Sequence, residues 1–505
     1  MDQVGDRNLK QKIGLWLGPG AALGLLFFVD LVPDNAAVTR TAAVAVLMAV
    51  WWVTEAIPIP VTSLLPVALF PLLGIMNGRA VATTYFNDVI FLFLGGFIIA
   101  LAMQRWNLHR RVALWTVRLI GAGPRRIVLS FMLATAFISM WVSNTATAMM
   151  MVPIAISVII QFRESDPGGD VRRFAVPLLL GIAYSASIGG MATLIGTPPN
   201  LVLVKVFAIS FPGAPEITFA NWMAFALPLS VTFVMIAWVS LVLLFMPRRL
   251  TLPGRELFEE EYRKLGKVSY EEKIVLGLSF LLGLLWLFRL DMRLGAVTLP
   301  GWSSLWPVPD VIDDGTVAIT VALLLFLIPA RSSKGCLMNW ATASKLNWGI
   351  VLLFGGGFAL AAGFKDSGLS AWVADQMAGL SSVGPVLQVT GVCTVMTTLT
   401  EFTSNTATTQ IVLPLLASLA NATHIHPLLL MIPATLSASC AFMLPVGTPP
   451  NAIVFGSGEL RMADMIKAGI VMNVIGVVLI TGLMFLSGLT VFAIDPITPP
   501  PWLAP

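Results

Sequence analysis

Long apolar runs, separated by short polar segments, follow one another along most of the chain. The runs measure roughly 16 to 27 residues, and about 20 apolar residues are enough for a helix to cross the hydrocarbon core of a bilayer. The pattern therefore predicts an all-α polytopic membrane protein with about eleven transmembrane helices. We expect these helices near 13–32, 39–57, 58–76, 88–104, 174–210, 221–246, 272–290, 315–330, 348–364, 428–450 and 468–494.

Two polar motifs occur twice, in the same order, inside this apolar sequence. Ser-Asn-Thr-Ala-Thr at 143–147 recurs at 404–408, 261 residues later, and Gly-Thr-Pro-Pro-Asn at 196–200 recurs at 447–451, 251 residues later. Helix-breaking polar motifs duplicated in hydrophobic sequence are typical of transporters whose binding site lies between two structural repeats. A third echo, glycines followed by phenylalanine, lies at 94–97 and 355–358.

The first Ser-Asn-Thr motif lies at the centre of a predicted re-entrant hairpin, 127–162. Basic segments flank this stretch on both sides, and basic loops face the cytoplasm, so the chain must return to the side from which it entered. The second hairpin, 385–420, has only Lys365 in its flanks and is expected to enter from outside. Two halves of opposite orientation make an inverted repeat. The proline pairs are expected to unwind the helices at 174–210 and 428–450.

This topology places the N-terminus in the cytoplasm and the C-terminus outside, and it divides the chain into five parts. They are scaffold helices at 1–87, a first transport repeat at 88–220 with hairpin 127–162, scaffold helices at 221–347 with the cytoplasmic loop 247–273, a second transport repeat at 348–467 with hairpin 385–420, and a final helix with an external tail at 468–505.

The chemistry of the motifs suits ions. An Asn side chain offers a carbonyl oxygen to a cation and an NH2 group to a carboxylate. Unwound helices free carbonyl oxygens for a cation such as Na+, and helix N-termini favour anions. Hydroxyls at Ser139 and Thr400 stand four residues before each motif and face the same way on a helical arm.

These paired motifs make the chain resemble, over essentially its full length, the divalent anion/sodium symporter family of di- and tricarboxylate carriers. The resemblance implies a homodimer in the plasma or inner membrane that moves a transport part against a scaffold in an elevator mechanism. It implies transport of di- or tricarboxylates with Na+ as the coupling ion and no organic cofactor. The short tails and compact loops look like those of a bacterial carrier and favour import of C4-dicarboxylates such as succinate, fumarate and malate.

The resemblance also implies two Na+ sites and a substrate site. Thr403 and Gly447 are expected to act through their backbone carbonyls. The first Na+ site falls on Ser139, Ser143, Asn144 and Gly196, the second on Thr400, Thr403, Asn405 and Gly447, and the substrate on Asn144, Thr145, Asn405 and Thr406 with Thr197, Thr448, Pro198 and Pro449 nearby.

Composition and charge exclude several other classes. With 57% hydrophobic and 11% charged residues, the chain is not a water-exposed domain. The net charge of +4 reports topology rather than nucleic-acid binding. No histidine is expected at depth and no second acid pairs with Glu401, so an intramembrane enzyme is disfavoured. A passive channel is also disfavoured, because conduction needs ion sites weak enough for the ion to leave, and two hairpins with cation sites do not suit that.

Three alternatives stay open. A Na+-independent exchanger of this family is expected to carry basic side chains where this chain has Ser139 and Thr400, so symport is favoured. Citrate or sulfate would use the same chemistry as a dicarboxylate. A proton-driven exporter would need a titratable group near the site, and Glu401 is the candidate. Otherwise Glu401 tunes cation affinity or is a hydrogen-bonded structural group.

Overall fold

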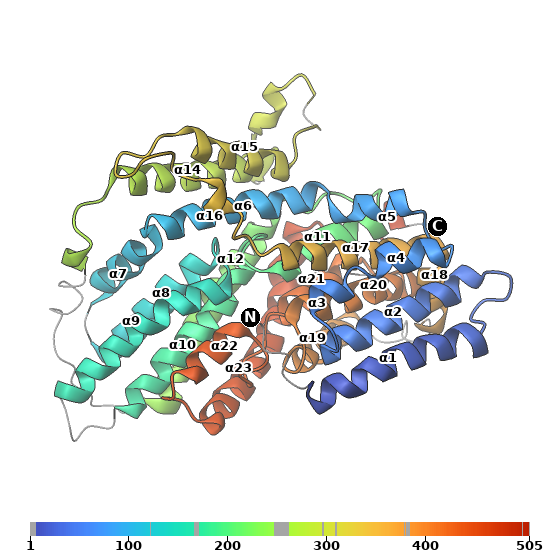
Figure 1. Cartoon of the computed structure of the whole chain (residues 1–505), viewed down its shortest axis with the longest axis horizontal. Coiled ribbons are helices and arrows are strands. Elements are labelled where there is room, and N and C mark those ends of the chain that lie inside the picture. Colours follow the sequence, from blue (N-terminus) through green and yellow to red (C-terminus); the bar gives the residue numbers. More distant parts are fainter. Residues whose placement is uncertain are drawn as a thin grey trace.

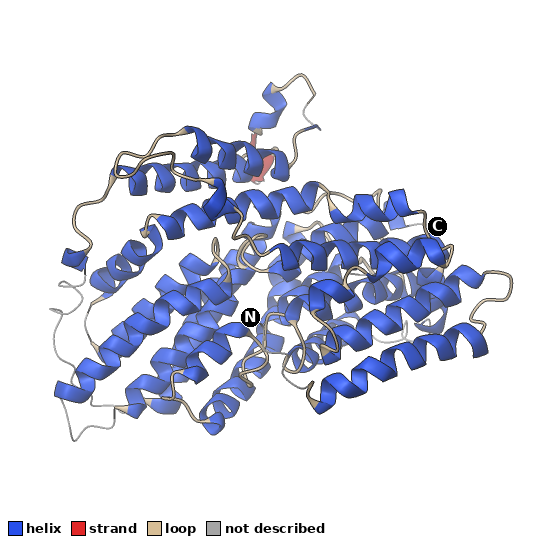
Figure 2. Ribbon diagram, in the orientation of Figure 1, coloured by secondary structure: helices blue, strands red, loops and turns tan. Residues whose placement is uncertain are grey.

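The chain forms a bundle of helices that run in a broadly common direction, as the computed structural model shows (Figure 1). Nearly all regular structure is helical (Figure 2). The structure describes residues 7–121, 123–165, 171–246, 262–294, 297–308, 311–377, 379, 384–496 and 498–503. Most of the predicted loop 247–273 lies outside these residues.

The first half of the chain contains the helices that carry the first pair of motifs. Its elements are α1 (Leu9–Phe28), α2 (Ala36–Thr54), α3 (Ile59–Thr62), α4 (Leu65–Leu72), α5 (Gly78–Tyr85), α6 (Asp88–Arg105), α7 (Leu108–Ile120), α8 (Pro124–Ser139), α9 (Asn144–Ser165), α10 (Arg172–Met191), α11 (Pro198–Ser210) and α12 (Phe219–Phe245).

The second half adds one pair of short antiparallel strands that the sequence did not predict. Its elements are α14 (Tyr270–Leu287), β1 (Met292–Leu294), β2 (Val297–Leu299), η1 (Trp302–Leu305), α15 (Asp314–Leu327), α16 (Trp340–Ala343), α17 (Trp348–Ser367), α18 (Leu369–Met377), α19 (Pro385–Thr400), α20 (Asn405–Thr423), α21 (Leu428–Ser437), α22 (Pro449–Gly456), α23 (Met462–Leu483), η4 (Met484–Gly488), α24 (Leu489–Val491) and η5 (Pro501–Leu503).

The helix starts repeat with the motif offsets. The helices α8 and α9 begin 261 residues before α19 and α20, and α11 begins 251 residues before α22. Proline stands in the first turn of α8, α19, α11 and α22, where its missing N–H costs nothing and its fixed φ favours the helix. The short helix α18 begins 261 residues after α7, so these two helices are also counterparts in the two halves.

The single helix predicted at 58–76 is wrong. The chain forms two short helices there, α3 and α4, with a turn at Ser63 and Leu64. Pro66 lacks an N–H and so cannot donate to the carbonyl of Thr62, the last residue of α3, which weakens a continuous helix at this point. The last helix begins at Met462 rather than 468 and contains a π-helical segment, η4.

The two helices of the first predicted hairpin are joined by residues 140–143. The first, α8, is short at 16 residues, as expected, but α9 has 22 residues. Seven helices in the described part of the chain are long and apolar enough to cross a membrane, including Asn144–Arg163. Length alone therefore leaves the re-entrant course of this hairpin, and the count of eleven spans, as predictions.

Two apolar clusters hold the bundle together. The larger extends over α6 to α12 and α19 to α23, and the smaller joins α2, α4 and α5 to α17. The amphipathic helix α7 is tied to α14 by an ion pair of 2.8 Å between Arg111 and Glu272, while Trp115, one turn further along α7, is 53% exposed. This arrangement agrees with a helix at the membrane surface.

The repeated glycine segments are sites of close helix contact. A Cβ at Gly95 in α6 would lie 2.6 Å from the backbone of Ala318 in α15, and a Cβ at Gly356 in α17 would lie 2.4 Å from the carbonyl oxygen of Ser63. Only glycine permits backbones to approach this closely. The echo at 94–97 and 355–358 therefore marks corresponding points where the two halves pack against other helices.

We expect Gly356→Ala to destabilise the protein, because the added methyl group would collide with a backbone oxygen that cannot move without shifting α3. Overpacking of this kind costs about 1–3 kcal/mol, which would appear as a lower apparent melting temperature in detergent. Gly24→Ala in α1 is the matched control, since a Cβ there meets no atom within 4 Å. Equal melting temperatures for both variants would contradict the proposed packing role.

Candidate functional site

The first polar cluster forms where α8 ends and α9 begins. Ser139 is the last residue of α8 and is fully buried, and Asn144 is the first residue of α9. The Oγ of Ser139 lies 2.7 Å from Oδ1 of Asn144 and 2.7 Å from the carbonyl oxygen of Ala186 in α10. A hydroxyl has one proton, so three oxygens meet here with one hydrogen among them. Such a surplus of oxygen acceptors suits a small cation.

A fourth oxygen approaches the same place because position 190 is glycine. A Cβ at Gly190 would lie 2.6 Å from Oδ1 of Asn144 and 3.0 Å from the carbonyl oxygen of Gly196. Ser139, Asn144 and Gly196 are thus brought together. The Oγ of Ser143, just before α9, accepts a weak hydrogen bond of 3.4 Å from the backbone N–H of Ala146 in that helix.

The second cluster repeats this geometry at the start of α20. The Oγ1 of Thr400 lies 2.7 Å from Oδ1 of Asn405 and 2.6 Å from the carbonyl oxygen of Ala438. Thr400, like Ser139, is the last residue of its arm and is fully buried. Gly447 lies beside Glu401, because a Cβ there would be 3.3 Å from the Glu401 carbonyl oxygen and 3.4 Å from its Oε2.

Thr403 uses its hydroxyl within the second hairpin. It donates to the carbonyl oxygen of Leu399 at 2.7 Å and lies 2.5 Å from the hydroxyl of Thr408. Its side chain is therefore occupied, which leaves the expected backbone role open to it. Thr145 is half-buried at the first tip, and Thr406 is 8% exposed at the second.

The threonines of the Gly-Thr-Pro-Pro motifs are the N-caps of the two half-helices. Thr197 precedes Pro198 in α11 and Thr448 precedes Pro449 in α22, and both have extended backbone. Neither side chain makes a capping hydrogen bond. The buried hydroxyl of Thr448 has no partner among the described residues.

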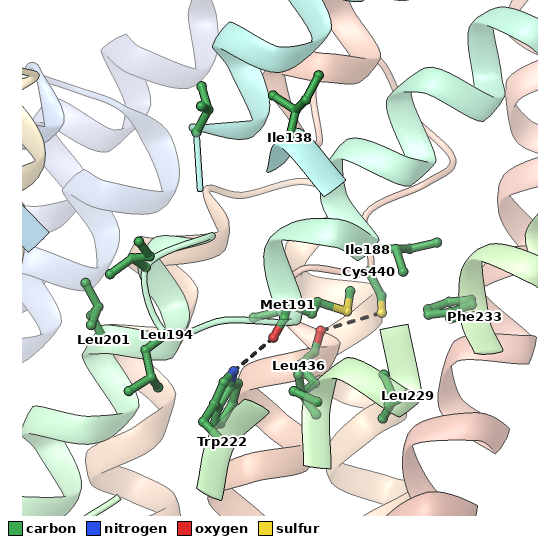
Figure 3. Close-up of a cluster of buried hydrophobic side chains, with 14 of the residues drawn as sticks. Ile138, Ile188, Met191, Leu194, Leu201, Trp222, Leu229, Phe233, Leu436 and Cys440 are labelled. Carbon is green, nitrogen blue, oxygen red and sulfur yellow. Dashed lines mark hydrogen bonds between the residues drawn. The ribbon is translucent and has the colours of Figure 1, made fainter. Parts of the chain in front are cut away.

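Side chains pair the backbone carbonyls that are freed where α10 stops. The break covers residues 192–197, and Nδ2 of Asn200 donates to the carbonyl oxygen of Thr193 at 2.7 Å. The indole of Trp222 donates to the carbonyl of Met191 at 2.9 Å, within an apolar cluster (Figure 3). The Thr193 hydroxyl donates to the carbonyl of Met140 at 2.5 Å. The hairpin tip and the break are thus fixed to each other.

The second break is longer, residues 438–448, and is paired in a related way. Nδ2 of Asn451 donates to the carbonyl oxygens of Ala441 and Leu444, both at 3.0 Å. The hydroxyl of Tyr184, from α10 in the other repeat, donates to the carbonyl of Phe442 at 3.0 Å. The repeats therefore stabilise one another at the breaks.

The two clusters are linked through crossed packing. The half-helix α11, which begins at the first cluster, packs against α20, and α22 packs against α9. Four helices, α9, α11, α20 and α22, begin with motif residues. Their N-termini carry partial positive charge that favours an anion. No lysine or arginine occurs in the motifs themselves.

Several residues of the site were not predicted from the sequence. Asn200 and Asn451 close the repeated five-residue motifs, so their duplication was a usable signal. Thr193 and Asn473 lie outside any repeated motif, and only the structure reveals their contacts with the tips. The sequence marks Glu401 as a candidate for tuning cation affinity, but only the structure shows its hydrogen-bond partners.

Known proteins resemble this chain in sequence and fold. Residues 21–493 match the family described as "Sodium:sulfate symporter transmembrane region". The sodium-dependent dicarboxylate transporter SdcS of Staphylococcus saprophyticus is 41% identical over 507 residues, covering 98% of this chain and 94% of that protein. SdcS of Staphylococcus aureus is 43% identical over 496 residues, covering 96% and 92%.

Among solved structures, MtrF of Neisseria gonorrhoeae, described within a class of antimetabolite efflux pumps, matches with a TM-score of 0.56 at 15% identity. The match covers 92% of this chain and 97% of MtrF, and it shows a shared fold alone. The sequence matches confirm the resemblance drawn from the paired motifs, and they make the chain a multi-pass membrane transporter rather than an enzyme. The chain belongs to the divalent anion:Na+ symporter family.

Proposed function

We propose that this protein imports C4-dicarboxylates such as succinate, fumarate and malate together with Na+. The observation that carries the proposal is the pair of matching clusters, each with three oxygens around one hydroxyl proton. Oxygen ligands from hydroxyl, amide and backbone groups are those that transporters use for Na+. The similar proteins of both staphylococci are named sodium-dependent dicarboxylate transporters, which supports the same pairing here.

The roles of the residues follow from which atoms face the clusters. The Oδ1 atoms of Asn144 and Asn405 face the hydroxyls, so their NH2 groups are left to donate to substrate carboxylates. Ser143 and Gly196 complete the first Na+ site in this proposal, and Thr403 and Gly447 complete the second. Substrate would lie between the tips, near Thr145, Thr406, Thr197, Thr448, Pro198 and Pro449.

Charge balance requires the dicarboxylate and Na+ to bind together. A dicarboxylate brings two negative charges, and a buried anion needs a compensating charge. The motifs contain no basic side chain, so helix N-termini and bound Na+ must supply the positive charge. Substrate affinity should therefore rise with Na+ concentration.

An elevator movement of a homodimer is part of the proposal, with scaffold helices at 1–87 and 221–347 and transport repeats at 88–220 and 348–467.

The proposal predicts uptake of labelled succinate into proteoliposomes that depends on an inward Na+ gradient. Because coupled ligands change each other's affinity about 5- to 150-fold, uptake should fall by about that factor when K+ replaces Na+ at fixed pH. Uptake that ignores Na+ but rises with succinate loaded inside would instead indicate an exchanger. Competition by citrate or sulfate, measured in the same vesicles, tests the alternative substrates.

We expect Ser139→Ala and Thr400→Ala to raise the Na+ concentration for half-maximal uptake about tenfold or more, since a hydrogen-bonding group to a charge contributes about 1.5–3 kcal/mol. Ser157→Ala and Thr394→Ala are matched controls, because those hydroxyls are exposed and bond only to carbonyls of their own helix. Unchanged Na+ dependence in the first pair would remove these hydroxyls from the cation sites.

Asn451→Leu should reduce both stability and uptake, because it leaves two carbonyl oxygens of the second break unpaired. Each buried unpaired polar group costs about 1–3 kcal/mol. Thermal unfolding in detergent and succinate uptake would both be measured. Asn421→Leu is the control, since Asn421 lies exposed near the end of α20. A stable, fully active Asn451→Leu protein would show that the break does not depend on this amide.

A further inference from the structure

Glu401 stands at a position where the two repeats differ in charge. It follows Thr400 at the second tip, and the residue at the same place in the first repeat is Met140. Glu401 is 2% exposed. Among the described residues it forms no ion pair, so a buried acid at a hairpin tip has only neutral partners within the protein.

Those partners are four N–H donors. The carboxylate accepts from the backbone N–H groups of Phe442 at 2.8 Å, Met443 at 3.0 and 3.1 Å, and Leu444 at 3.1 Å. Nδ2 of Asn473 in α23 donates to it at 2.8 Å. An ionised carboxylate is an acceptor only, and this shell of donors matches it.

The connection between tip and break is made differently in the two repeats. In the first, Thr193 reaches from the break to the backbone carbonyl of the tip residue, Met140. In the second, the position equivalent to Thr193 is Leu444, and the tip side chain Glu401 reaches into the break instead. The second break is five residues longer. The N–H groups of Ala438, Ser439 and Cys440 still reach carbonyls of the preceding turn, and those of 442–444 find their acceptor in Glu401.

The final helix is built to take part in this contact. A Cβ at Gly469 in α23 would lie 2.4 Å from Cα and 2.6 Å from N of Met443. The glycine lets α23 touch the backbone of the break, and Asn473, one turn later, reaches the carboxylate. Through Gly469, α23 contacts the backbone of Met443 directly. Through Asn473, it contacts the Glu401 carboxylate that binds the same backbone segment.

The carboxylate also lies beside the second oxygen cluster. A Cβ at Gly447 would be 3.4 Å from Oε2 of Glu401, whereas the equivalent sequence position in the first repeat is the uncharged Met140. A full negative charge next to a cation site attracts the cation, strongly so where water is excluded. Bound Na+ would in turn compensate a buried charge that has no cationic side chain as partner.

We infer that Glu401 is a positioning residue of the second cluster, which fixes the backbone of 442–444 and adds a negative charge, so that this cluster binds Na+ more tightly than the first. The inference rests on the proposed function, in that it takes the clusters to be Na+ sites.

The test is Na+-dependent thermal stabilisation of the purified full-length protein, with choline replacing Na+ at constant ionic strength. Glu401→Gln keeps the shape and removes the charge, and it should raise the half-saturating Na+ concentration at least tenfold. Met140→Leu changes the equivalent position of the first repeat and should stay within twofold of wild type. A Glu401→Gln value within twofold of wild type would overturn the inference.

Succinate uptake at saturating Na+ separates positioning from general damage. Glu401→Gln should regain at least half of the wild-type maximal rate when Na+ is raised, because the defect is in cation affinity. A maximal rate that stays low while the half-saturating Na+ concentration is unchanged would indicate a merely structural role and would count against the inference.

Asn473→Ala covers the case in which Glu401→Gln does not fold. It removes one of the four donors and keeps the charge, so a rise of about threefold in half-saturating Na+ is expected. No rise would overturn the inference in that case. If Na+ stabilises the wild type but does not drive succinate uptake, the proposed function fails while the Glu401 comparison still decides the inference. If Na+ does not stabilise the wild type, both fail.

Discussion

The backbone polar groups of the two broken helices must be paired inside the protein, because lipid offers no hydrogen-bond partner. The breaks at 192–197 and 438–448 leave a run of carbonyl and N–H groups without helical partners. Side chains supply much of the pairing, from Asn200 and Trp222 at the first and from Asn451 and Glu401 at the second. At each cluster three oxygens share one hydroxyl proton, and we propose that a cation binds there.

This constraint explains why polar residues are concentrated at so few places in an apolar chain. Each hairpin arm ends in a hydroxyl that reaches a backbone carbonyl, that of Ala186 in α10 for the first hairpin and that of Ala438 at the start of the second break for the second. Small residues allow that approach, and Gly190 leaves room for the oxygens of Asn144 and Gly196. The same residues therefore pack the breaks and form the oxygen clusters, so a substitution that changes the packing also changes the chemistry of the clusters.

Much of this organisation could be predicted from the sequence, because duplication is visible without a structure. The paired motifs located the clusters at Ser139, Asn144, Thr400 and Asn405, and the structure brings these residues within hydrogen-bonding distance. The broken helix at 59–72 was missed because the length of the apolar run was weighed above Pro66, and the longer α9 was missed because helix ends depend on neighbours that periodicity does not reveal. The N–H shell of Glu401 could not be foreseen, because its donors lie 41 to 72 residues away in sequence.

The crossed packing of the half-helices bears on how the cargo moves. Because α11 starts at the first cluster and packs on α20, while α22 starts at the second and packs on α9, neither cluster can shift without moving both hairpins. Tyr184 adds a hydrogen bond from the first repeat to the second break. Independent opening of each hairpin would have to separate these contacts. Movement of both clusters as one body leaves them intact, and for that reason the packing favours the elevator mechanism that we propose over two separate gates.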